Sequence, residues 1–497
     1  MTTASPTTTR RRSPNEDSLA IAALGPVAPA LGWRAPGAGR AAWARPARAY
    51  AATTTQAAGL FPFVAGSGAP TAGVPLGRHL TWGEVVCADP FSWMEAGITT
   101  NTGMFLLGQP GVGKSALAKR LTLGMAAFGV RPIILGDTKG EHTAIIAALG
   151  GQVIRVGRGL DRINPLDPGP LGQIIDRLPT DRAHALRAEV RGRQLTSLMA
   201  LCALVRGTGG APVSNGEEVL LGHALDQLTT RGTVPTVPAL LALLREPTPA
   251  LLHAAEGRTR RDYDDATREL RRTLNLLSAG ALAGVFDGPS TTTLDLTAPG
   301  ISVDISATAA AGDTLVAAAM LATWSAGFGT VDATTALADA GLATPRRHLM
   351  VMDELWRALR GAPGLVEHAD ALTRLNRSRG IASLMITHSL SDLEALPTRA
   401  DVAKARGFVE RSAIVALGGL PRRELAAVTQ VAALTEREVD LVTSWSSAES
   451  WQPGARHPGR GSYLLKTGQR PGLPLAMQLT ASETVLYDTD TRIRRAG

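Results

Sequence analysis

The sequence predicts an α/β protein: a parallel sheet covered by helices on both faces and interrupted by an all-helical insertion. On both sides of residues 171–285, short apolar runs that end in glycine or in polar residues alternate with longer helical stretches. This alternation is typical of parallel strands connected by helices. Within 171–285 it stops, and leucines recur at helical spacing instead, as in Leu221, Leu225 and Leu228. The insertion is therefore expected inside one sheet-forming domain.

Each element is expected from its own pattern. The apolar run 104–107 ends in glycine and is followed by a helical pattern over 116–128. In the insertion, Ser214 with Glu217 three residues later forms a capping box, and Thr236 marks a second helix start. Further strands are expected at 133–135, 153–156, 301–305, 349–352, 383–386, 413–416, 462–465 and 475–479.

These elements divide the chain into five segments. Residues 1–60, rich in Thr, Ala, Pro, Arg and Gly, are expected to form a disordered basic arm. The sheet domain is expected over 61–170 and 286–425, with the helical insertion over 171–285 between its two parts. A C-terminal segment with two short strands is expected over 426–497.

Composition excludes several classes of protein. The chain has 497 residues and a net charge of +8, and seven of its arginines lie in the first 50 residues, so the remainder is close to neutral. Cys87 and Cys202 are too few for a disulfide framework, and no zinc-binding pair is present. No run of about 20 apolar residues is found, so we expect a cytoplasmic protein without an integral membrane segment. The three arginines at 10–12 also suit a secretory signal, but glycine and prolines break the stretch that follows.

Lysine is rare in this chain. Of the 51 basic residues, 46 are arginines. Because arginine is the default cation, each lysine is informative about its position. The five lysines are Lys114, Lys119, Lys139, Lys404 and Lys466.

The strongest motif is a glycine-rich loop between the 104–107 strand and the next helix. It fits the pattern G-x-x-x-x-G-K-[ST], in which backbone N–H groups surround phosphate oxygens and a helix N-terminus faces the anion. We expect Lys114 to reach the β- and γ-phosphates of ATP, and Ser115 to hold Mg²⁺. The alternative is a glycine turn with a stray lysine. The residues expected to bind the nucleotide are Gly108, Gln109, Pro110, Gly111, Val112, Gly113, Lys114, Ser115 and Ala116.

An acidic pair follows the apolar run 349–352. Asp353 and Glu354 stand at the carboxyl end of that strand, the edge of an open α/β sheet where ligands bind. We expect Asp353 to hold Mg²⁺ through water and Glu354 to act as the general base, so that Glu354 and Lys114 are the catalytic residues. The alternative is an acidic pair that opens a helix, where carboxylates are favoured.

Two further segments at this edge are candidates for contact with the nucleotide. Thr387 and His388 end the apolar run 381–386 and would sense the γ-phosphate, or else lie in a solvated loop. Lys139, in the segment 137–141, would contact the nucleotide or a conformational relay, or else lie in a solvated turn.

An arginine cluster precedes the 383–386 strand. One of its members would act as an arginine finger in the site of a neighbouring subunit and stabilise transition-state charge there. A solvated helix face is the alternative. The three candidates are Arg374, Arg377 and Arg379.

Over about residues 75–490 the chain resembles the VirB-type ATPases of conjugation and type IV secretion, within the FtsK/HerA class of P-loop motor ATPases. The glycine loop and acidic pair are generic to the superfamily. The Asp-x-Lys-Gly-Glu stretch at 137–141 and the Arg-Ile-Asn-Pro-Leu-Asp stretch at 162–167 point to this family. The other matching stretches are Asp89-Pro90-Phe91, Ala96-Gly97, Gly150-Gly151 and Phe286-Asp287-Gly288-Pro289.

The resemblance implies a RecA-like P-loop NTPase core with a helical insertion that works as a homo-hexamer. It also implies nucleotide-site roles for Lys114, Ser115, Asp353 and Glu354. Two features depart from the family pattern. The residue at 388 is usually Gln, and here it is His388. The family also commonly carries a large amino-terminal domain for docking on the membrane channel, whereas about 75 residues of mostly arm stand there in this sequence, which implies weak docking or docking through another protein.

Three functions follow as hypotheses. The leading one is ATP hydrolysis that drives a conjugation-type secretion complex, with channel proteins as partners and peripheral contact at the inner face of the cell membrane. A DNA-translocating ATPase of the coupling-protein type would grip DNA phosphates with basic pore residues, and the near-neutral core disfavours it. An assembly factor that binds ATP without turnover is the third, and the complete set of site residues argues against it.

Overall fold

The computed structural model describes residues 68–207, 210–256, 259–280, 282–361, 366, 369–370, 379–447, 457 and 459–488. All of them belong to one compact unit that spans 66–497. The arm expected over 1–60 lies outside the described residues, as do two of the arginine-finger candidates, Arg374 and Arg377.

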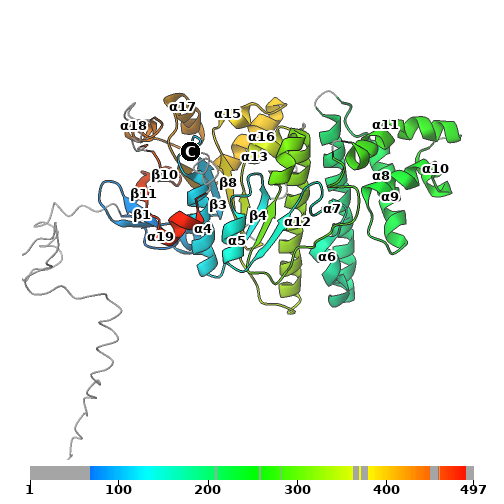
Figure 1. Ribbon diagram of the computed structural model, residues 1–497, viewed down its shortest axis with the longest axis horizontal. Coiled ribbons are helices and arrows are strands. Elements are labelled where there is room, and N and C mark those ends of the chain that lie inside the picture. Colours follow the sequence, from blue (N-terminus) through cyan, green and yellow to red (C-terminus); the bar gives the residue numbers. More distant parts are fainter. Residues whose placement is uncertain are drawn as a thin grey trace, which may run out of the picture. The chain divides into compact units, whose positions relative to one another are not determined.

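The described residues form one mixed sheet of eleven strands (Figure 1). The strand order is β2-β1-β11-β10-β9-β3-β8-β7-β4-β6-β5. In chain order the strands are β1 (Pro75–His79), β2 (Val85–Cys87), β3 (Gly103–Leu107), β4 (Arg131–Asp137), β5 (Gln152–Arg155), β6 (Ile301–Asp304), β7 (His348–Met352), β8 (Ile381–Thr387), β9 (Ile414–Leu417), β10 (Ser462–Lys466) and β11 (Leu473–Met477).

The predicted parallel sheet is present, but it forms only part of a larger mixed sheet. Seven strands, from β9 to β5, pair in parallel. The two short C-terminal strands, β10 and β11, extend this sheet with antiparallel pairing, and β1 and β2 continue it to the edge. Strands β1 and β2 were not predicted, because β1 contains Pro, Gly and Arg and β2 is only three residues long.

Helices connect these strands. Outside the insertion they are α3 (Pro90–Glu95), α4 (Lys114–Ala127), α5 (Thr143–Ala148), α12 (Asp313–Asp339), α13 (Leu355–Leu359), α15 (Ser391–Glu394), α16 (Arg399–Glu410), α17 (Arg422–Val431), α18 (Glu436–Ser444) and α19 (Ala481–Leu486). Between β5 and β6 lie α6 (Gly169–Ile174), α7 (Thr180–Arg206), α8 (Asn215–Thr230), α9 (Val237–Arg245), α10 (Pro249–Ala254) and α11 (Arg260–Ala279).

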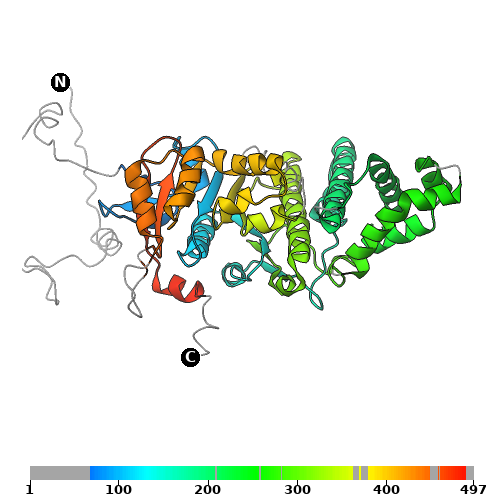
Figure 2. The same ribbon diagram turned by 90° about the horizontal axis from the view of Figure 1, so that it is seen from above.

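Side chains alternate between the two faces of the central strands. In β3, Phe105 and Leu107 lie in an apolar cluster with side chains of α12 and α16. Met104 and Leu106 point the other way and lie in a second cluster with side chains of α4 and α5. Helices therefore cover both faces, as the sequence predicts, and Figure 2 shows α4 and α16 on opposite sides of the sheet.

The run of helices between β5 and β6 begins where the predicted caps stand. The Ser214 hydroxyl accepts from the Glu217 N–H, and the Glu217 carboxylate accepts from the Ser214 N–H, so the capping box at the start of α8 is confirmed. Thr236 caps α9 in the predicted way. The long helix α12 links the sheet to the helices between β5 and β6, because it packs on β4 and also against α6 and α7 (Figure 1).

Helix α12 is a core helix by its surroundings. Among the described residues it is the one helix long and apolar enough to cross a membrane by length and composition, but 83% of its most apolar window is buried inside the protein. A Cβ atom at Gly327 would stand 2.3 Å from the Leu135 side chain. The helix therefore lies against β4 so closely that only glycine fits at this position.

The amino edge of the sheet contains a buried histidine. His348, at the start of β7, is fully buried, and neither ring nitrogen has a hydrogen-bond partner within the described part of the chain. Its neighbour across the sheet is Arg131 of β4. Burial, with Arg131 and Arg346 nearby, lowers the pKa of His348 to about 3.

Replacing His348 should therefore change how stability depends on pH. The unfolded chain binds a proton at this histidine below about pH 6.5, whereas the folded protein binds it only near pH 3. Linkage predicts that the wild type loses about 1.4 kcal/mol between pH 7.5 and 5.5 through this residue alone, and that His348→Leu does not. Urea midpoints at the two pH values measure this. His253→Leu, on an exposed part of α10, is the control; equal pH sensitivity in all three proteins would contradict the prediction.

Candidate active site

The glycine-rich loop between β3 and α4 is shaped by two glycines. Gly111 and Gly113 have φ angles of +87° and +97°, a region that other residues rarely adopt. The start of the loop is held by the segment after β9, because the Gln109 N–H donates to the Gly419 carbonyl at 3.0 Å. The backbone therefore curves back toward the N-terminus of α4, as a loop that surrounds a phosphate must do.

The ammonium group of Lys114 is buried within this loop. Its Nζ donates to the carbonyls of Gly108 (2.6 Å) and Gln109 (3.1 Å), and it lies 2.8 Å from His388 Nδ1. Burial lowers the pKa of Lys114 to about 8, although the nearby carboxylates of Glu354 and Asp353 oppose that shift. A phosphate that binds in the loop would have to compete with these carbonyls for the ammonium.

His388 joins the lysine to the acidic pair. Its Nδ1 faces Lys114, and its Nε2 lies 2.9 Å from Glu354 Oε1. An ammonium group can only donate a hydrogen bond, and an ionised carboxylate can only accept one. Between an ammonium and a carboxylate, the His388 ring therefore accepts at Nδ1 and donates from Nε2.

Glu354 is held on both carboxylate oxygens. Besides His388, Oε1 accepts from Lys139 Nζ at 2.7 Å, and Oε2 accepts from Trp356 Nε1 at 2.7 Å. Burial alone would raise the pKa of Glu354, but the hydrogen bonds from His388 and Lys139 lower it below its usual range. The backbone of Glu354 is left-handed, with φ of +52°, a strained conformation that clusters at functional sites. This carboxylate is thus ionised and fixed in direction.

Asp353 contacts a histidine in the segment that follows β4. Its Oδ1 accepts from the Glu354 N–H at 2.9 Å, and its Oδ2 lies 3.9 Å from Nε2 of the fully buried His142. Burial alone would lower the pKa of His142, but the carboxylates of Asp353 and Asp137 raise it. Asp137 in turn accepts three backbone N–H groups of the 139–142 segment, at 2.8–3.3 Å. The turn that carries Lys139 is thereby fixed.

The remaining predicted residues lie at different places. Thr387 ends β8 beside Leu107 of β3, and its buried hydroxyl has no hydrogen-bond partner among the described residues. Ser115 lies in the first turn of α4. Arg379 precedes β8 at the amino edge of the sheet, opposite the glycine loop, and its Nη1 lies 3.2 Å from Asp332 Oδ1. Among the described candidates, hydrogen bonds therefore join Lys114, His388 and Glu354, whereas Arg379 lies away from them.

Sequence reasoning missed several contacts. Lys139 lies in a bend with an exposed side chain, as the solvated-turn alternative has it, but its ammonium also pairs with Glu354, and its scarcity as a lysine was the available signal for that contact. His142 directly follows the 137–141 stretch, but nothing in its local pattern indicated burial. Trp356 follows Glu354 by two residues, and nothing in the sequence indicated that its indole would bond to that carboxylate.

The stretch 162–167 lies elsewhere, next to the stretch 286–289 that also carried the resemblance. Arg162 Nη1 lies 3.8 Å from Asp287 Oδ1. The Asn164 N–H donates to Ser290 Oγ at 3.1 Å, and its side-chain amide donates to the Pro235 carbonyl at 2.8 Å. These contacts join the stretch that follows β5 to the start of α9 and to the segment before β6. The stretch therefore has a structural role.

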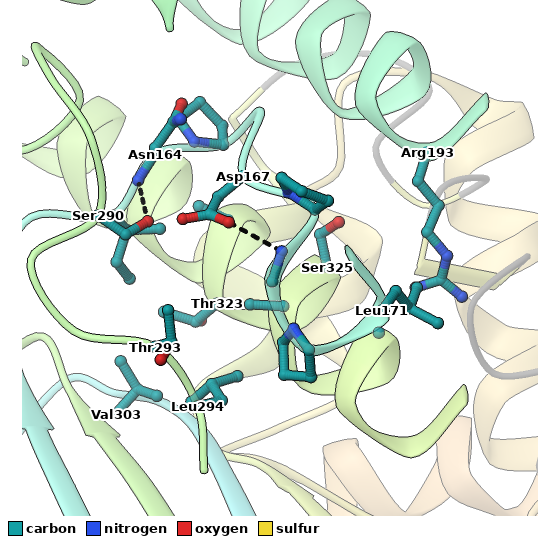
Figure 3. A pocket seen from close by; sticks show the side chains of 18 of the residues that line it. Asn164, Asp167, Leu171, Arg193, Ser290, Thr293, Leu294, Val303, Thr323 and Ser325 are labelled. Atoms are coloured by element: carbon teal, nitrogen blue, oxygen red, sulfur yellow. Dashed lines mark hydrogen bonds between the residues drawn. The ribbon is translucent and has the colours of Figure 1, made fainter. Parts of the chain in front are cut away.

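A pocket opens beside the 162–167 stretch (Figure 3). It encloses about 800 Å³, counting the space at its open mouth, between the stretch itself, α6, α7 and α12. Several of its polar groups already have partners: the Asn164 N–H donates to Ser290 Oγ, and the Gly169 N–H donates to Asp167 Oδ1. None of the nucleotide-site candidates lines it.

Comparisons with known proteins find likeness in structure. No family model and no curated protein matches the sequence. The structure is similar to that of VirB4 of Thermoanaerobacter pseudethanolicus, with a TM-score of 0.61 and 21% identity, covering 84% of this chain and 99% of that chain. The plasmid coupling protein TrwB in complex with ADP and Mg²⁺ has a TM-score of 0.47 at 14% identity, covering 76% and 86%. The latter score is too low to support a conclusion.

The fold is therefore similar to that of VirB4, and the mostly parallel α/β sheet with a helical insertion agrees with the sequence prediction. The sequence resembles the ATPases of conjugation and type IV secretion. The likeness of the fold to VirB4 agrees with that resemblance. A likeness at 21% identity extends to the fold and not to the activity.

The position of His388 leads to a prediction about its replacement. His388→Gln offers an acceptor for Lys114 and a donor for Glu354, so nucleotide hydrolysis should stay within about threefold of wild type. His388→Leu offers neither, and loses two hydrogen bonds to charged groups. Each is worth about 1.5–3 kcal/mol, and loss of the bond to Glu354 alone corresponds to a fall in turnover of about 10- to 150-fold. Steady-state phosphate release measures both variants. Equal activity of the Gln and Leu variants would contradict a role for these bonds.

Proposed function

We propose that the protein is an ATP-hydrolysing motor that energises a conjugation- or type IV secretion-like transfer complex. The observation that carries the proposal is the row of contacts from the glycine loop through Lys114 and His388 to Glu354. It connects the group that would bind the γ-phosphate with the group that would activate water. The fold shared with VirB4 and the family resemblance of the sequence support the biological setting.

Nucleotide binding would use the loop amides and Lys114. The residues from Gly108 to Ala116 surround the phosphates, and the N-terminus of α4 adds its positive end. Lys114 leaves the carbonyls of Gly108 and Gln109 when it moves to the phosphates. Because its pKa is lowered in the ligand-free site, the arrival of an anion also favours the charged ammonium.

Ser115 and Asp353 are proposed to hold Mg²⁺. A hydroxyl and a carboxylate are the hard oxygen donors that this ion prefers, and Mg²⁺ usually keeps several waters and needs few protein ligands. Asp353 suits the task because it is a buried carboxylate whose second oxygen makes only the weak 3.9 Å contact with His142 within the described part of the chain. When bound, Mg²⁺ would neutralise charge that develops on the phosphates.

Glu354 is proposed to position the attacking water. An ionised, fixed carboxylate accepts the proton of a water and directs its lone pair toward the phosphorus atom. When Lys114 moves to the phosphates, His388 loses its partner at Nδ1, so nucleotide binding changes the contacts of Glu354. Thr387, with its unpartnered hydroxyl, and His388 would thereby sense the γ-phosphate.

The working form is proposed to be a homo-hexamer in the cytoplasm that meets channel proteins at the inner face of the cell membrane through peripheral contact. In a ring, one of Arg374, Arg377 and Arg379 would serve the site of a neighbouring subunit. The proposed ATPase core consists of segments 61–170 and 286–425, with 171–285 as its helical insertion.

Two substitutions test the enzymatic part. Lys114→Ala should abolish turnover and weaken nucleotide binding at least tenfold. Glu354→Gln should lower kcat by about 10²–10⁴-fold and leave ADP binding intact, because the residue would act on water. Glu256→Gln is the matched control, since Glu256 is the other described non-glycine residue with positive φ and is exposed on the helical insertion. Undiminished hydrolysis by Glu354→Gln would remove that residue from the mechanism.

The same assay separates the functions. Phosphate release is measured alone and with single- or double-stranded DNA, and the mass of the sample in solution gives its oligomeric state. Hydrolysis that DNA leaves unchanged supports the secretion motor. Salt-sensitive stimulation by DNA favours a DNA-translocating coupling-type ATPase. Binding without phosphate release would favour an assembly factor and overturn the motor.

A further inference from the structure

The carbonyl groups of the glycine loop need partners of their own. When the N–H groups of such a loop face an anion, its carbonyls face away and must find donors inside the protein. Two separate sets of donors supply them here. Lys114 Nζ serves the carbonyls of Gly108 and Gln109 at the start of the loop. At its end the Gly113 carbonyl accepts from the Leu117 N–H of α4 at 3.1 Å, and the carbonyls of Val112 and Gly113 also bond to a distant segment, at the start of β10.

Tyr463 of β10 supplies a side-chain donor to the end of the loop. Its hydroxyl lies 2.6 Å from the Gly113 carbonyl and 3.3 Å from the Val112 carbonyl. One hydroxyl proton can make one strong bond, so the shorter contact is the main one. The Gly461 N–H, just before β10, also donates to the Val112 carbonyl at 2.9 Å. The end of the loop is thus attached to a segment about 350 residues further along the chain.

The tyrosine and the loop glycine fit each other. A Cβ atom on Gly113 would stand 2.9 Å from the Tyr463 hydroxyl, and the φ of Gly113 is +97°. Tyr463 is fully buried, and burial raises the pKa of its phenol, so the hydroxyl keeps its proton and remains a donor. Strand β10 is itself fixed, because it pairs with β9, and β9 pairs with β3, which leads into the loop.

The two sets of donors behave differently when a nucleotide binds. Lys114 must leave the first set of carbonyls to reach the phosphates. Tyr463 touches no phosphate-facing atom and has no reason to move. The start of the loop therefore exchanges a partner while its end remains attached to β10.

We propose that Tyr463 is a positioning residue for the nucleotide site. It holds the carbonyls of Val112 and Gly113 outward, and thereby keeps the N–H groups at the N-terminus of α4 directed at the phosphates. This inference rests on the proposed function, because it assigns Tyr463 a part in binding the polyphosphate of ATP. It acts through the loop and does not touch substrate.

Removal of one hydroxyl tests the inference. Tyr463→Phe keeps the ring and loses the donor, so the loop can reach more conformations before binding. We expect the KM for ATP and the Kd for ADP to rise about three- to tenfold, with kcat within about twofold of wild type. Titration calorimetry with Mg²⁺-ADP and steady-state hydrolysis give the two values, and thermal unfolding monitors the fold.

The control is a second buried tyrosine. Tyr263 of α11 is fully buried, and its hydroxyl donates to the Leu244 carbonyl at 3.1 Å, in the helical insertion. Tyr263→Phe removes a bond of the same kind and should leave KM and Kd unchanged. Tyr463→Met, which also lacks the hydroxyl, should weaken nucleotide binding at least as much as Tyr463→Phe.

The outcomes separate this inference from the proposed function. A wild type that neither binds nor hydrolyses ATP overturns the proposed function, and the role of Tyr463 with it. A wild type that binds ATP beside a Tyr463→Phe variant with the same KM and Kd overturns only the inference. So does equal loss of affinity in Tyr263→Phe, or loss of folding in both Tyr463 variants, because Tyr463 would then have a structural role alone.

Discussion

The site depends on a single buried ammonium group that is shared between alternative partners. In the described structure Lys114 donates to two loop carbonyls and to His388, and His388 donates to Glu354. A buried charge must keep hydrogen-bond partners, because an unpaired one is strongly unfavourable. An anion in the loop would therefore change the partners of Lys114 and, through one imidazole, those of Glu354. This change of partners would pass from the loop after β3 to the end of β7 through side chains, without movement of the backbone.

The order of strands in the sheet makes this short connection available. Strands β3, β8 and β7 are neighbours and run in parallel, so their carboxyl ends meet at one edge. Each contributes one member of the row: the loop after β3 contributes Lys114, β8 leads to His388, and β7 leads to Glu354. Residues separated by up to 274 positions thereby come within hydrogen-bond distance. Asp137 fixes the turn after β4, which adds Lys139 from the fourth strand.

The central parallel strands and the polar residues at their carboxyl ends could largely be predicted from the sequence, because parallel strands buried on both faces are apolar runs that end in polar residues. The antiparallel half of the sheet could not. Strand β1 contains Pro, Gly and Arg, β2 is only three residues long, and the sequence does not reveal that β10 joins β9. For the same reason the contact of Tyr463 with the loop was invisible, since it depends on a strand pairing with no local signature. His142 is similar: its burial follows from the packing of α5, not from its neighbours in sequence.

The distribution of lysine shows which positions require a compact cation. Lysine and arginine both provide positive charge, but an ammonium is a small point charge, whereas a guanidinium is a wide plane with five donors. In a chain that otherwise uses arginine, Lys114, Lys119 and Lys466 are 8%, 1% and 2% exposed. Lys119 lies on α4 against Tyr487, and Lys466 pairs with Glu438 inside the C-terminal segment. At such sites a guanidinium would displace neighbouring atoms or leave donors unpaired, so the rare residue is retained where space for the charge is smallest.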